Sequence, residues 1–174
     1  MSTTHSSRVA KKAPQLALRL GVLPVGAADW RDGSRVAYLG RELIVRLGTH
    51  HGVAEVDGED LHLPLPPEAN ARQIQDSAEA WLRQQCIEYI ERVIAQIRDR
   101  QLVPVARCPI RVQLSFAARS PWLAVEGEDT LRCNWRLIEL APAVIEQHAK
   151  KALGQLASLC DTNTTADMFG ALPA

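Results

Sequence analysis

The histidines are the side chains in this sequence that could most directly hold a metal ion. His50, His51 and His62 fall on two predicted hairpins, where they could meet across strands as a surface metal site or remain solvated turn residues. His148 falls on the apolar face of a predicted helix, and its partner one turn later is Ala152, so no histidine pair forms there. A lone histidine on such a face is more typical of a hydrogen-bonded core residue than of a ligand.

The cysteines show no spacing that is typical of a site. They lie far apart, at Cys86, Cys108, Cys133 and Cys160, and no C-x-x-C or C-x-x-x-C pair occurs. The usual spacings of structural zinc sites and of thioredoxin-type motifs are therefore absent. The sequence also lacks a glycine-rich phosphate loop and a G-x-S-x-G nucleophile turn. We predict free thiols in a reducing compartment, the cytoplasm.

Composition and charge limit the classes of partner. The 174 residues are 47% hydrophobic and 23% charged, which is ordinary for one soluble globular domain. Lys plus Arg and Asp plus Glu each number 20, and this balance disfavours nucleic acid, whose binders usually carry an excess of base. No stretch approaches the roughly 20 apolar residues that a membrane-spanning helix needs. The expected partner is a protein or peptide, with no membrane.

The N-terminal segment, residues 1–28, contains no acidic residue and several basic ones. We predict a disordered basic arm, because its first dozen residues are polar and nearly free of large apolar side chains. A secretory signal is one alternative, although Arg19 and Pro24 interrupt its apolar run. An organellar transit peptide is another, although Gly21 and Pro24 disfavour the amphipathic helix that it needs. At the other end, residues 170–174 are predicted to be a frayed tail.

Alternation of apolar and polar residues predicts an N-terminal sheet. From Val36 to Leu47 it indicates one hairpin, with its turn at Gly40 and Arg41. A second hairpin is expected over residues 53–65, around Asp57-Gly58, a pair that tolerates the positive φ of tight turns. Together they predict an antiparallel β-meander with one dry face.

Two helices and further strands are predicted after this sheet. A long amphipathic helix is expected over Glu68–Gln101, where apolar residues recur at steps of three and four. Extended segments follow at Ile110–Leu114 and Leu131–Trp135. A second helix starts at Pro142, since proline suits the first turn, and is predicted to break at Asp161–Thr165. The outline is one α+β domain.

Several strings recur in the order of a known family. Tyr38–Leu43 contains Y-x-G-x-x-L, Trp122 follows, and Leu131–Ile138 contains Asn134, Trp135 and Arg136 ahead of Pro142. These strings resemble the YgjP-like metallopeptidases, relatives of the SprT-type and other small zincins. The resemblance covers residues 36–169. It implies a zincin-like fold, a second helix that matches the family's active-site helix, and zinc-dependent peptide hydrolysis.

The same resemblance implies that the catalytic site is lost. In the family, an H-E-x-x-H helix and a later histidine hold zinc, and the glutamate takes a proton from zinc-bound water. Here Lys151 and Gln155 stand at the two histidine positions, Ala152 at the glutamate and Thr164 at the later histidine. Lysine is a cation, glutamine is a weak donor, and alanine cannot act as a base. We therefore predict a pseudopeptidase with no catalytic residue, metal ligand or cofactor.

The leading hypothesis is a scaffold that binds a protein or peptide. An extended peptide could add to the strand at 131–135, in a cleft beside the helix at 142–160. One alternative is an active metal-dependent hydrolase with an unrecognised site, for which the histidines are the candidates. Another is a structural subunit of a larger assembly, with the long helix or the basic arm as its contact. The sequence leaves the oligomeric state open.

Overall fold

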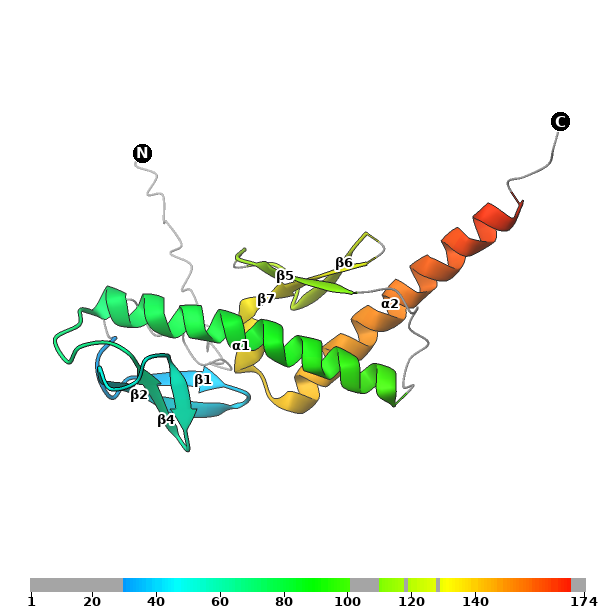
Figure 1. Cartoon of the computed structure of the whole chain (residues 1–174). Helices are drawn as coiled ribbons and strands as arrows, with labels where there is room; N and C mark the ends of the chain where they lie inside the picture. Colours follow the sequence, from blue (N-terminus) through cyan, green and yellow to red (C-terminus); the bar gives the residue numbers. More distant parts are fainter. Residues whose placement is uncertain (1–29, 101–109, 118, 128, 170–174) are drawn as a thin grey trace, which may run out of the picture.

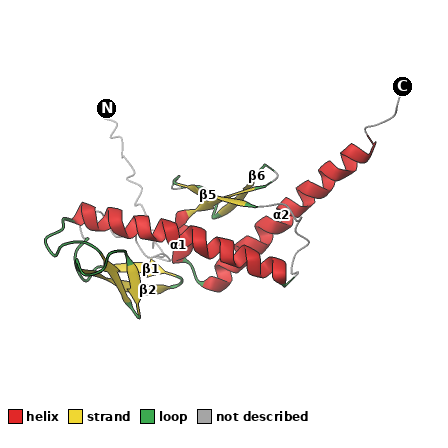
Figure 2. Ribbon diagram, in the orientation of Figure 1, coloured by secondary structure: helices red, strands yellow, loops and turns green. Residues whose placement is uncertain are grey.

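One long helix, α1 (Ala71–Asp99), organises the molecule (Figure 1). The computed structural model describes residues 30–100, 110–117, 119–127 and 129–169, and the predicted basic arm and frayed tail lie outside these ranges. One sheet lies against the N-terminal half of α1, a second sheet lies on its other side, and a second helix packs near its C-terminal half. Figure 2 shows this separation of helices and strands, which confirms the α+β class.

Sheet A is mixed rather than antiparallel. It contains β1 (Arg35–Tyr38), β2 (Arg41–Leu47), β3 (Glu55–Asp57) and β4 (Asp60–Leu63), in the spatial order β1-β2-β4-β3. Both predicted hairpins form, but β2 pairs with β4 in parallel, so the predicted antiparallel meander is wrong. The parallel register sets Val45 beside Leu61, and both side chains are fully buried. The short, largely exposed β3 is left at the edge.

The turn between β1 and β2 joins sheet A to the middle of the molecule. Leu39 and Gly40 have positive φ, at 49° and 75°, so the turn lies one residue earlier than predicted. The backbone N–H of Leu39 donates to the Ile138 carbonyl over 2.7 Å, and that of Gly40 donates to the Glu139 carbonyl over 3.2 Å. A larger residue does not fit at Gly40, because its Cβ would lie only 2.9 Å from Cα of Ala141.

Helix α1 begins at Ala71 rather than at the predicted Glu68, because Asn70 caps it. Oδ1 of Asn70 accepts from the Gln73 N–H over 3.0 Å, and Oε1 of Gln73 accepts from the Asn70 N–H over 2.9 Å. This reciprocal pair satisfies two amides that the first turn leaves without partners. The predicted apolar stripe is buried as one row: Ile74, Ala78, Leu82, Cys86, Ile90, Val93, Ile94 and Ile97.

Sheet B contains β5 (Arg111–Ser115), β6 (Leu123–Glu126) and β7 (Thr130–Asn134). Their order is β5-β7-β6, with β5 parallel and β6 antiparallel to β7. The sequence pattern did not predict β6, because its four residues show no regular alternation. The segment predicted to be extended to Trp135 stops one residue earlier, where a 3-10 helix, η1 (Trp135–Glu139), begins.

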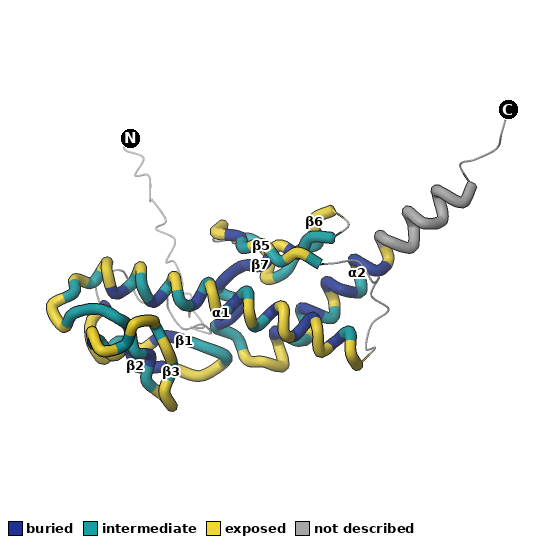
Figure 3. The backbone as a smooth tube through the Cα atoms, in the orientation of Figure 1, coloured by how far each residue is buried: buried dark blue, intermediate teal, exposed yellow. Residues whose placement is uncertain are grey.

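Helix α2 (Pro142–Phe169) starts at the predicted proline. The break predicted at Asp161–Thr165 is wrong, because that segment holds no proline or glycine to interrupt the backbone hydrogen bonds. The first half of α2 is packed on the core and shows dark blue turns in Figure 3. Among the described helices, none is long and apolar enough to cross a membrane.

We predict that Gly40→Ala destabilises the fold more than Gly58→Ala. Both glycines have positive φ, 75° and 60°, which costs an L-residue roughly 1–2 kcal/mol. A Cβ at Gly58 meets nothing within 4 Å, whereas at Gly40 it collides with Ala141, and such overpacking adds about 1–3 kcal/mol. Urea unfolding measures both losses. Equal losses would contradict the close contact between this turn and the start of α2.

Candidate functional site

The positions predicted to replace the zinc motif lie on two sides of α2. Lys151 and Gln155 are exposed, one turn apart, on the side that faces solvent. Ala152 is only 2% exposed and belongs to the core. Thr164 lies further along the same helix, in a part where the backbone alone is described. The structure therefore gathers Lys151 and Gln155 on one side of the helix, but not Ala152.

The side chains of Lys151 and Ala152 do not fit a zinc ion. Zinc in proteins takes thiolate, imidazole or carboxylate ligands, and neither an ammonium group nor a methyl group is one of them. Within the described ranges, no group of three or more His, Cys, Asp or Glu side chains is arranged to hold a metal ion. The exposed side of α2 has the character of a solvated helix surface rather than of a metal centre.

The three histidines beside sheet A gather as neighbouring rings. The rings of His51 and His62 are 4.6 Å apart at an interplanar angle of 29°, and the ring of His50 lies 5.4 Å from that of His51. Nδ1 of His51 contacts a carboxylate oxygen of Glu55 at 2.5 Å. The structure therefore brings the three histidines together, but within the described residues they are not part of a group of three or more side chains that could hold a metal ion. His148 is half-buried on α2.

Asn134 connects three segments at the end of β7. Its backbone N–H donates to the Trp122 carbonyl over 3.0 Å, and its Nδ2 donates to Oγ of Ser120 over 3.1 Å. Its Oδ1 accepts from the backbone N–H of Arg136 over 3.1 Å and so caps η1. These bonds satisfy a polar side chain that is nearly fully buried. The asparagine thereby fixes the turn that presents the next two residues.

Trp135 packs against two arginines. Cζ of Arg83, from α1, lies 5.3 Å from its ring, and Cζ of Arg136 lies 4.8 Å from it. Arg83 also lies 5.6 Å from the ring of Phe116. Contacts of this cation–π kind contribute about 0.5–2 kcal/mol each. They form a ladder of rings and guanidinium groups that joins the ends of β5 and β7 to α1.

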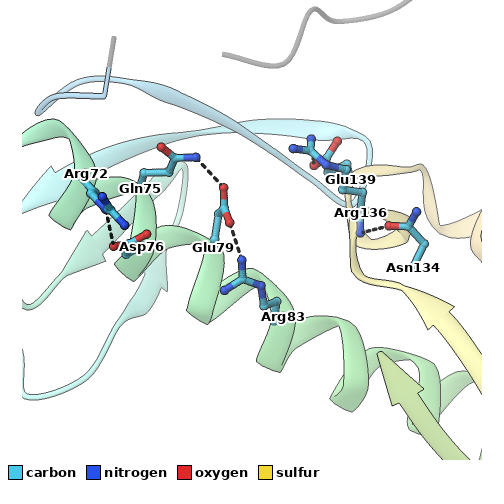
Figure 4. Close-up of polar contacts among 8 residues, drawn as sticks. All are labelled: Arg72, Gln75, Asp76, Glu79, Arg83, Asn134, Arg136 and Glu139. Carbon is cyan, nitrogen blue, oxygen red and sulfur yellow. Dashed lines mark hydrogen bonds and ion pairs between the residues drawn. The ribbon is translucent and has the colours of Figure 1, made fainter. Parts of the chain in front are cut away.

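Each of these two arginines forms a hydrogen bond with a carboxylate (Figure 4). Glu79 accepts hydrogen bonds from Arg83 over 2.5 Å and from Gln75 over 2.8 Å along α1. Glu139 accepts from Nη1 of Arg136 over 3.2 Å. Burial raises the pKa of Glu139, the charge of Arg136 opposes this rise, and the charge of Glu79 adds to it. The charged form of Glu139 is therefore destabilised in the folded chain.

Two further aromatic side chains are exposed at the same end of sheet B. Phe116 directly follows β5 and is 69% exposed, and Trp122 directly precedes β6 and is 37% exposed. Ser115 pairs with Asn134 in register, so both aromatics lie at the end of the sheet where η1 begins. We define the aromatic–arginine patch as Arg83, Phe116, Trp122, Trp135 and Arg136.

Sequence reasoning identified only part of this patch. The resemblance pointed to Trp122, Trp135 and Arg136, but nothing pointed to Arg83 or Phe116. An arginine beside an apolar helix stripe has the pattern of a solvated residue. The alternation of the preceding strand would place Phe116 inside, whereas β5 ends at Ser115 and the ring is exposed. The signal that could have found it is a large aromatic residue directly after a strand.

The cleft predicted beside the 131–135 strand cannot accept a peptide by strand addition. β7 is the central strand of sheet B and is paired with β5 on one side and with β6 on the other. Helix α2 packs against β6 instead. Within the described residues, the unpaired edges of this sheet are those of β5 and β6. The predicted docking to β7 is wrong because a central strand has no free backbone edge.

A small hollow lies away from the patch, between the end of α1 and the start of α2. Its volume is about 180 Å³, and Val93, Ile97, Arg100 and Glu146 are among its lining residues. Ligand pockets are usually about 300–1,000 Å³, so this hollow is small even for a drug-sized molecule. It shares no residue with the aromatic–arginine patch.

A comparison with models of known protein families gives a match that covers most of the chain. The model of the family described as YgjP-like, metallopeptidase domain, matches residues 4–147. The match includes sheet A, α1, sheet B and η1, and it ends in the first turns of α2. The positions of Lys151, Ala152, Gln155 and Thr164 lie beyond it, and their correspondence to the family's ligands stays a prediction. No curated protein and no solved structure matches the chain.

We predict that Glu139→Gln changes how stability depends on pH. The pKa of this carboxyl is raised in the folded chain, so its contribution to stability is present below the unfolded pKa and is lost as the pH rises through the folded pKa. Relative to Glu139→Gln, the wild type should therefore lose free energy of unfolding as the pH rises above the ordinary pKa of a glutamate, about 4.3.

Urea unfolding at several pH values measures this difference. Glu126→Gln is the matched control, since it removes an exposed carboxylate that pairs with Arg132 on the outer face of sheet B. A difference between wild type and Glu139→Gln that is constant, or that rises with pH, would contradict the raised pKa.

Proposed function

The chain belongs to the YgjP-like metallopeptidase family, and we propose that it is a non-catalytic member that binds a protein or peptide partner. The observation that carries this proposal is which residues occupy the predicted zinc positions of α2 and how far they are buried. Ala152, which the resemblance places at the general base, is buried in the core, and Lys151 and Gln155 face solvent. A zincin-like fold is part of the proposal, and the succession of sheet B, η1 and α2 supports it.

We place the binding surface at the aromatic–arginine patch. Tryptophan and arginine are enriched among the residues that carry most of the energy of protein interfaces. Here Trp135 and Asn134 are nearly buried and hold the surface rigid, while Phe116 is 69% exposed and free to be covered. A rigid aromatic surface loses little conformational entropy when a partner binds.

An acidic peptide segment suits this patch. Arg83 donates to Glu79 through Nη2, and its Nε is buried, so the donors left for a partner are those on its two terminal nitrogens. Arg136 donates to Glu139 through Nη1. A guanidinium has five N–H donors, so both arginines keep donors for a carboxylate of the partner. The ring of Phe116 would cover an apolar side chain beside that carboxylate.

The proposal also includes the location of the protein in the cell and the class of its partner. We propose a cytoplasmic location, because the buried Cys86 and Cys133 are free thiols, which are typical of reducing compartments. The equal numbers of acidic and basic residues, 20 of each, favour a protein partner over nucleic acid.

We predict that the purified chain binds zinc well below one ion per chain after equilibration with zinc and dialysis. The exposed side of α2 offers no imidazole or carboxylate at Lys151 or Gln155. Metal content is measured by plasma mass spectrometry, and a chelator should leave the melting temperature unchanged. Stoichiometric zinc together with chelator-sensitive hydrolysis of casein would contradict the proposal and establish the metal-dependent hydrolase.

We predict that a phage library of random peptides, panned on the full chain, yields peptides with Asp or Glu beside an apolar residue. Phe116→Ala should weaken the best of them about thirtyfold, which corresponds to the loss of about 2 kcal/mol expected for an interface hot spot. Val53→Ala is the matched control, because it removes an equally exposed side chain, 69%, from sheet A's side of the molecule. It should change the dissociation constant less than about twofold.

Two outcomes would contradict this assignment of the surface. One is an equal loss of affinity in Phe116→Ala and Val53→Ala. The other is a stable homo-oligomer in light scattering that Phe116→Ala dissociates, which would make the patch a contact between copies in a structural assembly.

A further inference from the structure

Two buried thiols meet behind the aromatic–arginine patch. Sγ of Cys86, on α1, lies 3.5 Å from Sγ of Cys133, on β7, although 47 positions separate them in the sequence. Both side chains are fully buried. Both sulfurs lie near the carbonyl oxygen of Asn134, Cys133 at 3.4 Å and Cys86 at 4.0 Å. The pair connects the long helix to the central strand of sheet B.

We propose that Cys86 and Cys133 form a redox-sensitive modification site, at which a peroxide converts the two thiols into a disulfide within one chain. The proposal stands on the contact between the sulfurs and does not depend on the proposed binding function. A disulfide brings its sulfurs to about 2.0 Å, so they must approach by roughly 1.5 Å. Side-chain rotation and a small shift of α1 against β7 supply such a movement.

The contact between the thiols decides which one reacts first. A hydrogen bond from the Cys133 thiol lowers the pKa of Cys86. The same contact, together with burial, raises the pKa of Cys133. Cys86 is therefore the first of the two to ionise, and the thiolate is the nucleophilic form of cysteine. Cys133 is left as the resolving thiol.

The chemistry proceeds in two displacements. The Cys86 thiolate attacks one oxygen of hydrogen peroxide, the O–O bond breaks, and hydroxide leaves a sulfenic acid on Cys86. The sulfur of Cys133 then attacks that sulfenic sulfur, the S–O bond breaks, and the S–S bond forms. The two protons of the thiols leave in water, so two thiols and one peroxide give one disulfide and two waters. The cysteines lose two electrons, and the peroxide gains them.

Burial determines how the site responds. Because both sulfurs are covered, a peroxide reaches Cys86 only after a local opening between α1 and β7, so oxidation is slower than that of an exposed thiol. Once a sulfenic acid forms, the second thiol is at contact distance and traps it before further oxidation. The bond would then tie α1 to β7 next to Asn134, which positions the patch.

Peptide mapping of the full chain tests this pairing directly. After treatment with hydrogen peroxide and alkylation with iodoacetamide, trypsin separates the four cysteines into the peptides 84–92, 108–111, 133–136 and 152–174. We expect peptide 84–92 to be linked to peptide 133–136, with the loss of two alkylatable thiols per chain. Dithiothreitol should restore both thiols.

Two variants serve as controls for this mapping. The double variant Cys108→Ser/Cys160→Ser keeps the pair and should give the same linked peptide in a monomeric chain. Cys86→Ser should abolish the link, and the double variant keeps the test valid if Cys86→Ser fails to fold. The proposal is overturned if Cys86 and Cys133 remain alkylatable in the oxidised chain, or if they link to Cys108, to Cys160 or between chains.

Discussion

The buried stripe of α1 is the constraint on which the rest of this structure depends. Two sheets of four and three strands are too small to enclose separate cores, and each needs an apolar surface to pack on. The stripe supplies that surface to sheet A near Ile74 and to η1, sheet B and α2 further along. Because the buried residues recur at steps of three and four along the whole helix, one helix packs against both sheets.

The residues at the end of β7 fix the position of the aromatic–arginine patch on this core. Asn134 is buried with its hydrogen bonds satisfied, and it sets the direction in which η1 leaves the sheet. Trp135 then contacts Arg83 from α1 as well as Arg136, so a ring that contacts two cations joins the helix to the end of the strand. The same junction contains the Cys86–Cys133 contact on its inner side. Rigidity at the patch is therefore a consequence of core packing directly beneath it.

Local patterns predicted the elements of this fold better than their pairing. Helical periodicity located α1 and the start of α2, and Asp57-Gly58 located the turn between β3 and β4. The parallel pairing of β2 with β4 was not predicted, because alternation shows which face is buried but not which strand lies next to which. The break expected in α2 rested on weak helix formers, and without proline or glycine these do not end a helix.

The candidate site was harder to predict than the fold, because it too depends on which segments lie next to each other in space. Its members come from α1, from the end of β5, from the start of β6 and from η1, so no single stretch of sequence carries it. Family resemblance supplied the residues around β7 because they form a continuous string. The arginine of α1 and the exposed phenylalanine are linked to that string only through space.

The exposed residues of α2 can change without much effect on the stability of the fold. Lys151 and Gln155 face solvent, and substitutions at such positions usually change stability by less than about 0.5 kcal/mol. Replacing a large buried aromatic such as Trp135 by alanine typically lowers the free energy of unfolding by about 3–5 kcal/mol. The contacts around Trp135 therefore make a large contribution to the stability of the fold. A chain can therefore keep the architecture of a hydrolase family while its exposed helix face carries side chains of any chemistry. Family membership, which here extends to residue 147, accordingly supports the scaffold, and activity has to be argued from the side chains that lie beyond it.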